Sequence, residues 1–510
     1  MASGAPADLA DRTTGLVGWT VAWRAASAVT TLALGYVLVR QLPKAEYGRY
    51  TLVLSLLVYL ALLATFGQDQ GLLRYLPEVL ARRDRDAAYD LLRKSGITLL
   101  GAWAGVSLLV FALRPVIDRA LNAQVGDLLA LGTVLLLGAI TTGALSFALV
   151  AVYDMRSQAL ATPIAGALTL VLAVLFLRRG GHLGAVLVAG AVGQSALALF
   201  YLNVLLRRIR LASGASAARV RWRRLLVYAS GWLPSLLIAS AVGLQFESLF
   251  LVHFRGTVQV AYYDTGYNIP QRLVSLIPSL LTGAWVVGTL ESFRGEAGHL
   301  RGAVNAFYKG IFMIGVPLAL AGGALLSPMI RFLYTEGYDQ AATIAPVMLE
   351  FFILALLVAP WGLVVRVREL AWVNAGISIA QVGFAAAADF WLVQAFGLWG
   401  AVAAVGLTTL LTLALSLFAW YRCDRGSLTI PWGYAARCLL ASLPFLLLAP
   451  LAALRLRLVL LLVLALLLTL AWAALVRRLK LLDVTEVPLL HHSRHPPVRF
   501  VLRWLAPTAE

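Results

Sequence analysis

Long apolar runs, separated by short polar segments, follow one another along almost the whole chain. A helix needs about 20 mostly apolar residues to cross a bilayer. The pattern predicts 14 such helices, with the first containing Arg24 and the seventh containing Glu247. The predicted spans are 15–39, 50–67, 95–113, 127–150, 158–177, 183–206, 226–252, 271–290, 307–327, 343–365, 371–392, 398–420, 433–453 and 457–476.

The composition points to the same fold class. Of the 510 residues, 61% are hydrophobic and only 13% are charged, against about 25% charged residues in an average soluble domain. A soluble chain of this length would need far more polar side chains to cover its surface. We therefore expect an all-α polytopic membrane protein, and the composition excludes a soluble enzyme, a disordered regulator and a disulfide scaffold.

The net charge of +18 is explained by topology rather than by nucleic-acid binding. With the N-terminus in the cytoplasm, the cytoplasmic segments hold 29 Lys and Arg residues and the opposite side holds 12. Cytoplasmic loops of membrane proteins accumulate these residues. The asymmetry predicts that both termini are cytoplasmic, and an even number of helices agrees with it.

The sequence also contains an internal repeat. A shift of 216 positions places Ala45 on Ala261 and Tyr47 on Tyr263, and it aligns a Gly-x-x-Gly-Ala-Val segment at 181–186 with another at 397–402. The shift covers six predicted helices, an even number, so both halves keep the same orientation in the membrane. This predicts two lobes related by a parallel pseudo-two-fold axis, as found among transporters.

The repeat divides the chain into five predicted parts. These are an N-lobe at 1–206, a basic cytoplasmic linker at 207–225, a C-lobe at 226–425, two additional helices at 426–480 and a cytoplasmic tail at 481–510.

Several short motifs bring a known family to mind. The segment Pro43–Tyr50, which contains Tyr-Gly-x-Tyr, lies at the start of the second predicted helix. Paired Gly-x-x-Gly-Ala segments, Gly181–Ala185 and Gly397–Ala401, open two later helices. Glu247–Leu251 is followed by Ala261–Tyr263. In their order and spacing these motifs resemble the polysaccharide-biosynthesis flippases of the multidrug/oligosaccharidyl-lipid/polysaccharide exporter superfamily.

This resemblance covers roughly residues 10–425 and carries functional expectations. Members of the family flip polyprenyl-pyrophosphate-linked oligosaccharides across the bacterial inner membrane through a central cavity between two lobes. It implies a lipid-linked oligosaccharide and membrane lipids as partners, and a glycan polymerase or glycosyltransferases as further candidates. It implies no catalytic activity and no cofactor. Glu247 departs from the family pattern, where an Asp is frequent in the seventh helix.

Charged residues inside apolar runs are the first candidate functional residues, because such charges are costly in a bilayer. Arg24 either binds the pyrophosphate in the lumen, which suits its planar donor fork, or forms a structural ion pair. Glu247 either couples transport to a proton or sodium ion, pairs with Arg24, or is a hydrogen-bonded structural carboxylate. Glu350 is a second candidate for coupling. It and Asp389 both rank below Glu247, and Asp389 lies close enough to a helix end to be merely solvated.

Boundary residues and aromatic residues complete the candidate set. Arg272 and Arg74 either meet the phosphate of the cargo or are interfacial residues whose charge reaches the headgroups. Tyr263 and Tyr267 either stack on sugar rings or belong to an interfacial aromatic belt. The sequence shows no cluster with metal-ligand spacing and no P-loop motif, so it indicates neither a metal site nor nucleotide hydrolysis by a P-loop.

Two other functions stay open. The first is a cation-coupled antiporter of small molecules with the same fold, although an arginine-lined lumen disfavours cationic drugs. The second is an integral membrane glycan polymerase or ligase, which the short predicted outer loops disfavour.

Overall fold

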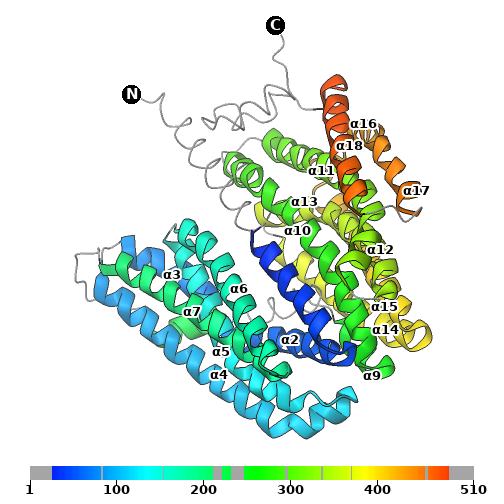
Figure 1. Cartoon of the computed structure of the whole chain (residues 1–510). Helices are drawn as coiled ribbons and strands as arrows, with labels where there is room; N and C mark the ends of the chain where they lie inside the picture. Colours follow the sequence, from blue (N-terminus) through cyan, green and yellow to red (C-terminus); the bar gives the residue numbers. More distant parts are fainter. Residues whose placement is uncertain are drawn as a thin grey trace. The chain divides into compact units, whose positions relative to one another are not determined.

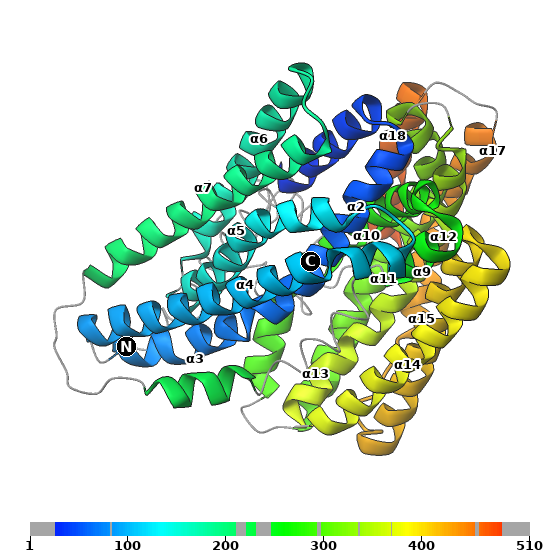
Figure 2. The same cartoon turned by 90° about the horizontal axis from the view of Figure 1, so that it is seen from below.

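The computed structural model describes residues 26–81, 84–152, 154–210, 221–230, 246–292, 297–334, 337–368, 370–453 and 458–481 (Figures 1 and 2). These residues are helical almost throughout, and none of them forms a strand. Eleven helices in this part of the chain are long and apolar enough to cross a membrane. The predicted all-α membrane architecture is confirmed. The expected spans 15–39, 226–252 and 271–290 lie partly outside the described residues or side chains, so the number 14 stays a prediction.

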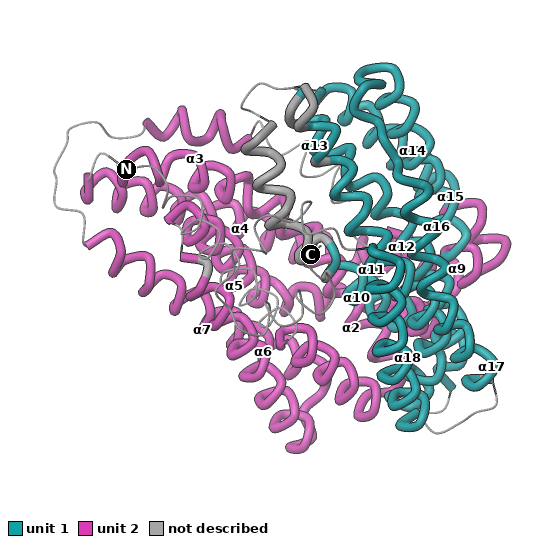
Figure 3. Tube along the Cα trace, turned by 90° about the horizontal axis from the view of Figure 1, so that it is seen from above, with its two compact units in different colours: residues 1–21, 265–388, 402–510 teal, residues 22–264, 389–401 magenta. Residues whose placement is uncertain are grey.

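The chain divides into two compact units, coloured separately in Figure 3. The first, here called the N-terminal unit, comprises residues 22–264 and 389–401. The second, here called the C-terminal unit, comprises residues 1–21, 265–388 and 402–510. The lobe bounds expected from the sequence repeat stay a prediction.

The N-terminal unit is a helical bundle built around α5. Besides helices over 26–41 and 222–230, it contains α2 (Lys44–Thr65), α3 (Gln68–Ala81), α4 (Arg85–Leu121), α5 (Gly126–Ala151), α6 (Met155–Arg178), α7 (Leu183–Arg210), α9 (Glu247–Arg255) and the start of α10 (Thr257–Ser292). Helix α5 packs against α2, α3, α4 and α7, and α4, α5 and α7 run alongside one another in Figure 1. Helix α4 extends well beyond the predicted span 95–113, into polar sequence on both sides.

Small residues allow this close packing. A Cβ atom added at Gly138 of α5 would lie 2.9 Å from the Cβ of Gln194 and 3.2 Å from the backbone nitrogen of Ser195, both on α7. The hydroxyl of Thr142 donates a hydrogen bond to the carbonyl of Gln194 over 3.0 Å. In a membrane, helices associate through close contacts and hydrogen bonds of this kind. Large apolar side chains such as Leu108 stay exposed (71%), as expected of a lipid-facing surface.

The C-terminal unit is built around α11. Its helices are α11 (Ala297–Leu333), α12 (Asp339–Ala355), α13 (Ala359–Val367), α14 (Ala371–Phe396, shared with the other unit), α15 (Leu398–Cys423, also shared), α16 (Trp432–Ser442), α17 (Leu448–Ala453) and α18 (Leu458–Arg478). Helix α11 packs against α12, α13, α16, α17 and α18. Helices α16, α17 and α18, which cover the expected spans 433–453 and 457–476, belong to this unit.

An aromatic core holds the C-terminal unit together. Tyr308 of α11 stacks on Trp420 of α15, with ring centroids 6.3 Å apart, and Trp420 lies 6.0 Å from Trp361 of α13. The predicted helices 343–365 and 433–453 are not continuous, because 3₁₀ turns at Leu356–Val358 and Leu443–Leu447 interrupt them. Both interruptions lie at prolines, which lack the amide that a continuing helix needs.

Candidate functional site

The Tyr-Gly-x-Tyr motif places one face of α2 against the first turns of α10. The Tyr47 hydroxyl donates a hydrogen bond to Oδ2 of Asp264 over 3.1 Å, and both residues are buried. Tyr50 interacts electrostatically with the same carboxylate. A Cβ atom at Gly48 would lie 1.8 Å from the carbonyl oxygen of Thr257. The motif therefore contains glycine because the α10 backbone occupies the space of a side chain.

This contact joins two helices that the sequence repeat makes equivalent. The 216-residue shift aligns Tyr47 of α2 with Tyr263 of α10, and the side chain of Tyr47 bonds to the residue that follows Tyr263. The Lys44 ammonium lies 5.7 Å from the centre of the Tyr262 ring, within reach of a cation–π interaction.

A second group of polar side chains lies in the same unit and is here called the acid–tyrosine cluster: Tyr59, Glu247, Tyr263 and Asp389. The Tyr263 hydroxyl donates a hydrogen bond to Oε2 of Glu247 over 3.0 Å. Tyr59 of α2 interacts electrostatically with both Glu247 and Asp389, and the two carboxylates interact with each other. The cluster combines α2, α9, α10 and the end of α14, which are far apart in sequence.

Asp389 is the most unusual member of the cluster. Its exposed fraction is 0%, and neither carboxylate oxygen has a hydrogen-bond partner among the described residues. The expectation that its position near a helix end leaves it solvated is wrong, because neighbouring helices cover it. A buried ion without partners is costly, and a second carboxylate close by adds repulsion. Uptake of a proton or a cation by the pair would relieve both costs.

The other predicted residues lie elsewhere. Tyr267 is buried, with its ring 4.8 Å from that of Phe352 in an edge-on contact. Arg272 of α10 is half-buried, Arg74 of α3 is exposed and Glu350 of α12 is exposed, while Arg24 lies outside the described residues. Among the predicted site residues, the structure thus brings Glu247 and Tyr263 into direct contact.

Sequence reasoning missed Tyr59 and Asp264 and ranked Asp389 too low. Asp264 follows directly after Tyr262 and Tyr263, and a carboxylate beside the tyrosines of the Ala261–Tyr263 motif was the available signal. In the described part of the chain, no group of three or more His, Cys, Asp or Glu side chains is arranged to hold a metal ion.

Comparison with known protein families identifies the chain at a coarse level. The family described as "Polysaccharide biosynthesis protein" matches residues 18–286, which is more than half of the chain. The protein belongs to this family. No curated protein sequence matches it significantly.

Solved structures share the fold at low sequence identity. The structure "Lipid II flippase MurJ, inward closed conformation" is similar with a TM-score of 0.67 and 11% identity, over 90% of this chain and 99% of that chain. An inward-facing multidrug resistance MATE family transporter has a TM-score of 0.60 and 16% identity, over 79% and 96% of the two chains. The Vibrio cholerae MATE transporter VcmN has a TM-score of 0.55 and 12% identity, over 83% and 98%. The polysaccharide biosynthesis family member is thus a multi-pass membrane protein with the fold of flippases and transporters.

Proposed function

We propose that this protein moves lipid-linked oligosaccharides, the precursors of a cell-surface polysaccharide, across the bacterial inner membrane by alternating access. The family match over residues 18–286 carries the proposal, because it connects the chain with polysaccharide biosynthesis. The fold shared with a protein named as a lipid II flippase supports it. The excess of Lys and Arg on one side favours an orientation with both termini in the cytoplasm.

In this mechanism cationic residues bind the pyrophosphate of the cargo. Arg24 and Arg272 are the proposed ligands, since guanidinium groups form paired hydrogen bonds with phosphate oxygens. Arg74, which is exposed, meets the phosphate at the membrane interface. Tyr267 is buried against Phe352 and is the less favoured contact for the sugar. The polyprenyl chain stays in the lipid throughout, and the protein acts as a transporter and not as an enzyme.

The acid–tyrosine cluster is the proposed coupling site. Glu247 and Asp389 take up a proton or a sodium ion, which neutralises the buried carboxylates and changes the packing of α9 and α14 against α2. Tyr263 bonds to Glu247, so we assign it to coupling rather than to sugar binding. Glu350 is exposed on α12 and is the less favoured coupling residue.

A specific observation also favours the antiporter alternative. The paired carboxylates of the acid–tyrosine cluster suit exchange of a cation, and transporters named for multidrug resistance share the fold. The family match and the predicted intramembrane arginines place this function second. A glycan polymerase or ligase is the third candidate.

The test is deletion of the gene followed by mass spectrometry of the lipid-linked saccharides. We expect a complete polyprenyl-pyrophosphate oligosaccharide to accumulate on the cytoplasmic side. A strain with Glu247→Gln should show the same accumulation, and one with Arg93→Ala, on an exposed position of α4, should behave as wild type. Accumulation of an unpolymerised glycan outside the membrane would favour the enzyme, and unchanged lipid-linked species would favour the antiporter.

A further inference from the structure

A polar cleft in the N-terminal unit is lined by residues that do not belong to the acid–tyrosine cluster. Its volume is about 550 Å³, within the usual range of 300–1,000 Å³ for small-molecule sites. It is lined by the first turns of α2, the end of α4, the start of α5 and the start of α7. The lining residues are Glu46, Arg49, Asp118, Gln124, Asp127, Leu128, His182, Leu183 and Gly184.

The cleft brings together two of the motifs recognised in the sequence. Glu46 and Arg49 belong to the segment Pro43–Tyr50, and His182 and Gly184 belong to the first Gly-x-x-Gly-Ala segment. The acid–tyrosine cluster uses neither Glu46 nor Arg49. These motifs therefore supply side chains to a common surface that the proposed coupling mechanism does not explain.

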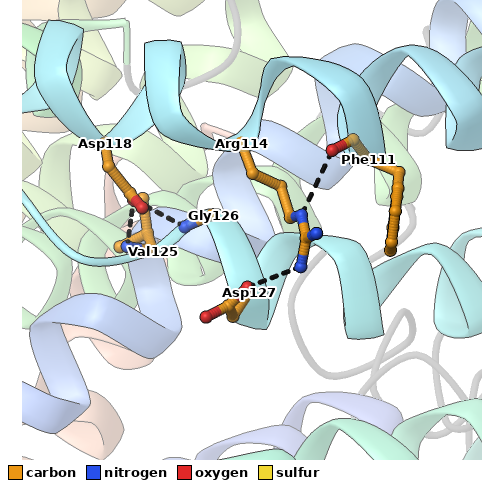
Figure 4. A network of polar contacts seen from close by, with 6 residues as sticks. All are labelled: Phe111, Arg114, Asp118, Val125, Gly126 and Asp127. Atoms are coloured by element: carbon orange, nitrogen blue, oxygen red, sulfur yellow. Dashed lines mark hydrogen bonds and ion pairs between the residues drawn. The ribbon is translucent and has the colours of Figure 1, made fainter.

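The far wall of the cleft is held in place by a network between α4 and α5 (Figure 4). Oδ1 of Asp118 accepts hydrogen bonds from the backbone amides of Val125 and Gly126, each over 2.7 Å. Arg114 donates to Oδ1 of Asp127 over 2.8 Å and to the carbonyl of Phe111 over 3.1 Å. One oxygen of each aspartate thus fixes the turn between α4 and α5, and the second oxygen is available to a ligand.

The near wall offers charged groups that have no protein partner. Among the described residues, the side chains of Glu46 and Arg49 make neither a hydrogen bond nor an ion pair, and both residues are only partly exposed. The cleft therefore presents carboxylate acceptors together with a guanidinium and an imidazole. The three carboxylates of the lining would repel a phosphate, because both carry negative charge. Arg49 and His182 supply hydrogen-bond donors that a cation would not use. A polyhydroxylated neutral molecule matches this mixture, because each hydroxyl both donates and accepts.

We propose that this cleft binds neutral sugar residues of the transported oligosaccharide. The inference rests on the proposed function and on the predicted orientation, which places the start of α2, the end of α4 and the starts of α5 and α7 on the outer side. The cleft is then an exit-side sugar site, distinct from the place where the pyrophosphate binds. Glu46 and Asp118 accept hydrogen bonds from sugar hydroxyls, and Arg49 and His182 donate to them.

The test uses purified full-length protein in detergent micelles and saturation-transfer NMR. The probe is the oligosaccharide pool released by mild acid from the host's total lipid-linked saccharides. Wild type and Arg93→Ala should give equal transfer to sugar protons. Arg49→Ala should weaken binding by about tenfold to a hundredfold, as expected for loss of one hydrogen bond to a charged group. Glu46→Gln keeps an acceptor oxygen but removes its charge, so it should weaken binding by about threefold to tenfold. Glu46→Gln keeps the side-chain shape, and unchanged helix content by circular dichroism confirms folding of each variant.

Three results would overturn the sugar site. They are no transfer from the wild-type protein, transfer in both Glu46→Gln and Arg49→Ala equal to that of wild type, and competition by inorganic phosphate or by the cation ethidium at the same residues. The proposed function would be refuted by a different result, namely that gene deletion leaves the lipid-linked saccharides unchanged. Accumulation in the deletion strain together with unaffected sugar binding in both variants would reject the cleft and retain the flippase.

Discussion

Replacement of Asp389 by leucine should stabilise the protein while impairing transport. Leucine branches at the same carbon as aspartate and has as many side-chain heavy atoms, so it fits the same space. The native carboxylate is fully buried and without a hydrogen-bond partner among the described residues. Removal of an unsatisfied buried polar group relieves about 1–3 kcal/mol. Asp389→Leu should therefore raise the free energy of unfolding by about that amount.

Tyr263→Phe is the matched comparison and should act in the opposite direction. It removes the donor that bonds to Oε2 of Glu247 over 3.0 Å and leaves a carboxylate oxygen without that partner. The expected loss of stability is about 1–3 kcal/mol. Both variants change the same cluster by a few atoms. Opposite signs of the change in the free energy of unfolding would therefore distinguish a hydrogen-bonded carboxylate from one without a partner.

The assay is thermal unfolding in detergent, followed by circular dichroism at the helix band in sodium-free buffer near neutral pH. The midpoint should rise by a few degrees for Asp389→Leu and fall by a few degrees for Tyr263→Phe. Both variants should accumulate lipid-linked saccharide in cells. If Asp389→Leu lowers the midpoint as Tyr263→Phe does, Asp389 is a structural residue and the reasoning about coupling fails.

Two further predictions concern packing and pH. Gly48→Ala should destabilise the protein by about 1–3 kcal/mol or more, because the added methyl group overpacks against α10. Gly105→Ala is the control and should not destabilise it, since a Cβ atom there meets no atom within 4 Å. Equal unfolding midpoints of the two variants in circular dichroism would contradict the close contact between Gly48 and α10. At Asp154, burial favours the neutral form, but hydrogen bonds from Ser157 and Arg208 outweigh it and lower the pKa of the carboxyl. Its stabilising effect is then present above the unfolded pKa of about 3.9 and is lost as pH falls through the lower folded value. The midpoint difference between wild type and Asp154→Asn should shrink in that acidic range, and a difference independent of pH would contradict the lowered pKa.

The membrane-spanning helices could be predicted because the signal is local. An apolar run of about 20 residues has few alternatives to a spanning helix, and eleven of the expected spans correspond to such helices. Hydropathy does not detect helix outside the bilayer, so it missed the extension of α4 to Arg85 and Leu121. It also missed the 3₁₀ turns near Pro360 and Pro444, because both prolines lie within apolar runs and do not lower the hydropathy.

Only some residues of the candidate site, and none of its contacts, could be predicted from the sequence. Glu247 was recognised because a charge in an apolar run is unusual, and Tyr263 because an aromatic ring can stack on a sugar. Their hydrogen bond, and the burial of Asp389 beside them, depend on how α2, α9, α10 and α14 pack. The same is true of Asp264, whose partner Tyr47 lies at the start of α2. Contacts between residues so distant in sequence follow from tertiary packing, which hydrophobic periodicity does not specify.

Reconstitution of the purified protein tests the central claim most directly. Vesicles would contain the lipid-linked oligosaccharide extracted from the deletion strain, and a membrane-impermeant glycosidase or periodate would report the fraction of headgroups on the outer leaflet. With wild-type protein, nearly all of the headgroups should become accessible with time. With Glu247→Gln the rate should fall at least tenfold, and protein-free vesicles should stay near half. Accessibility that remains near half with wild-type protein would contradict the flippase function.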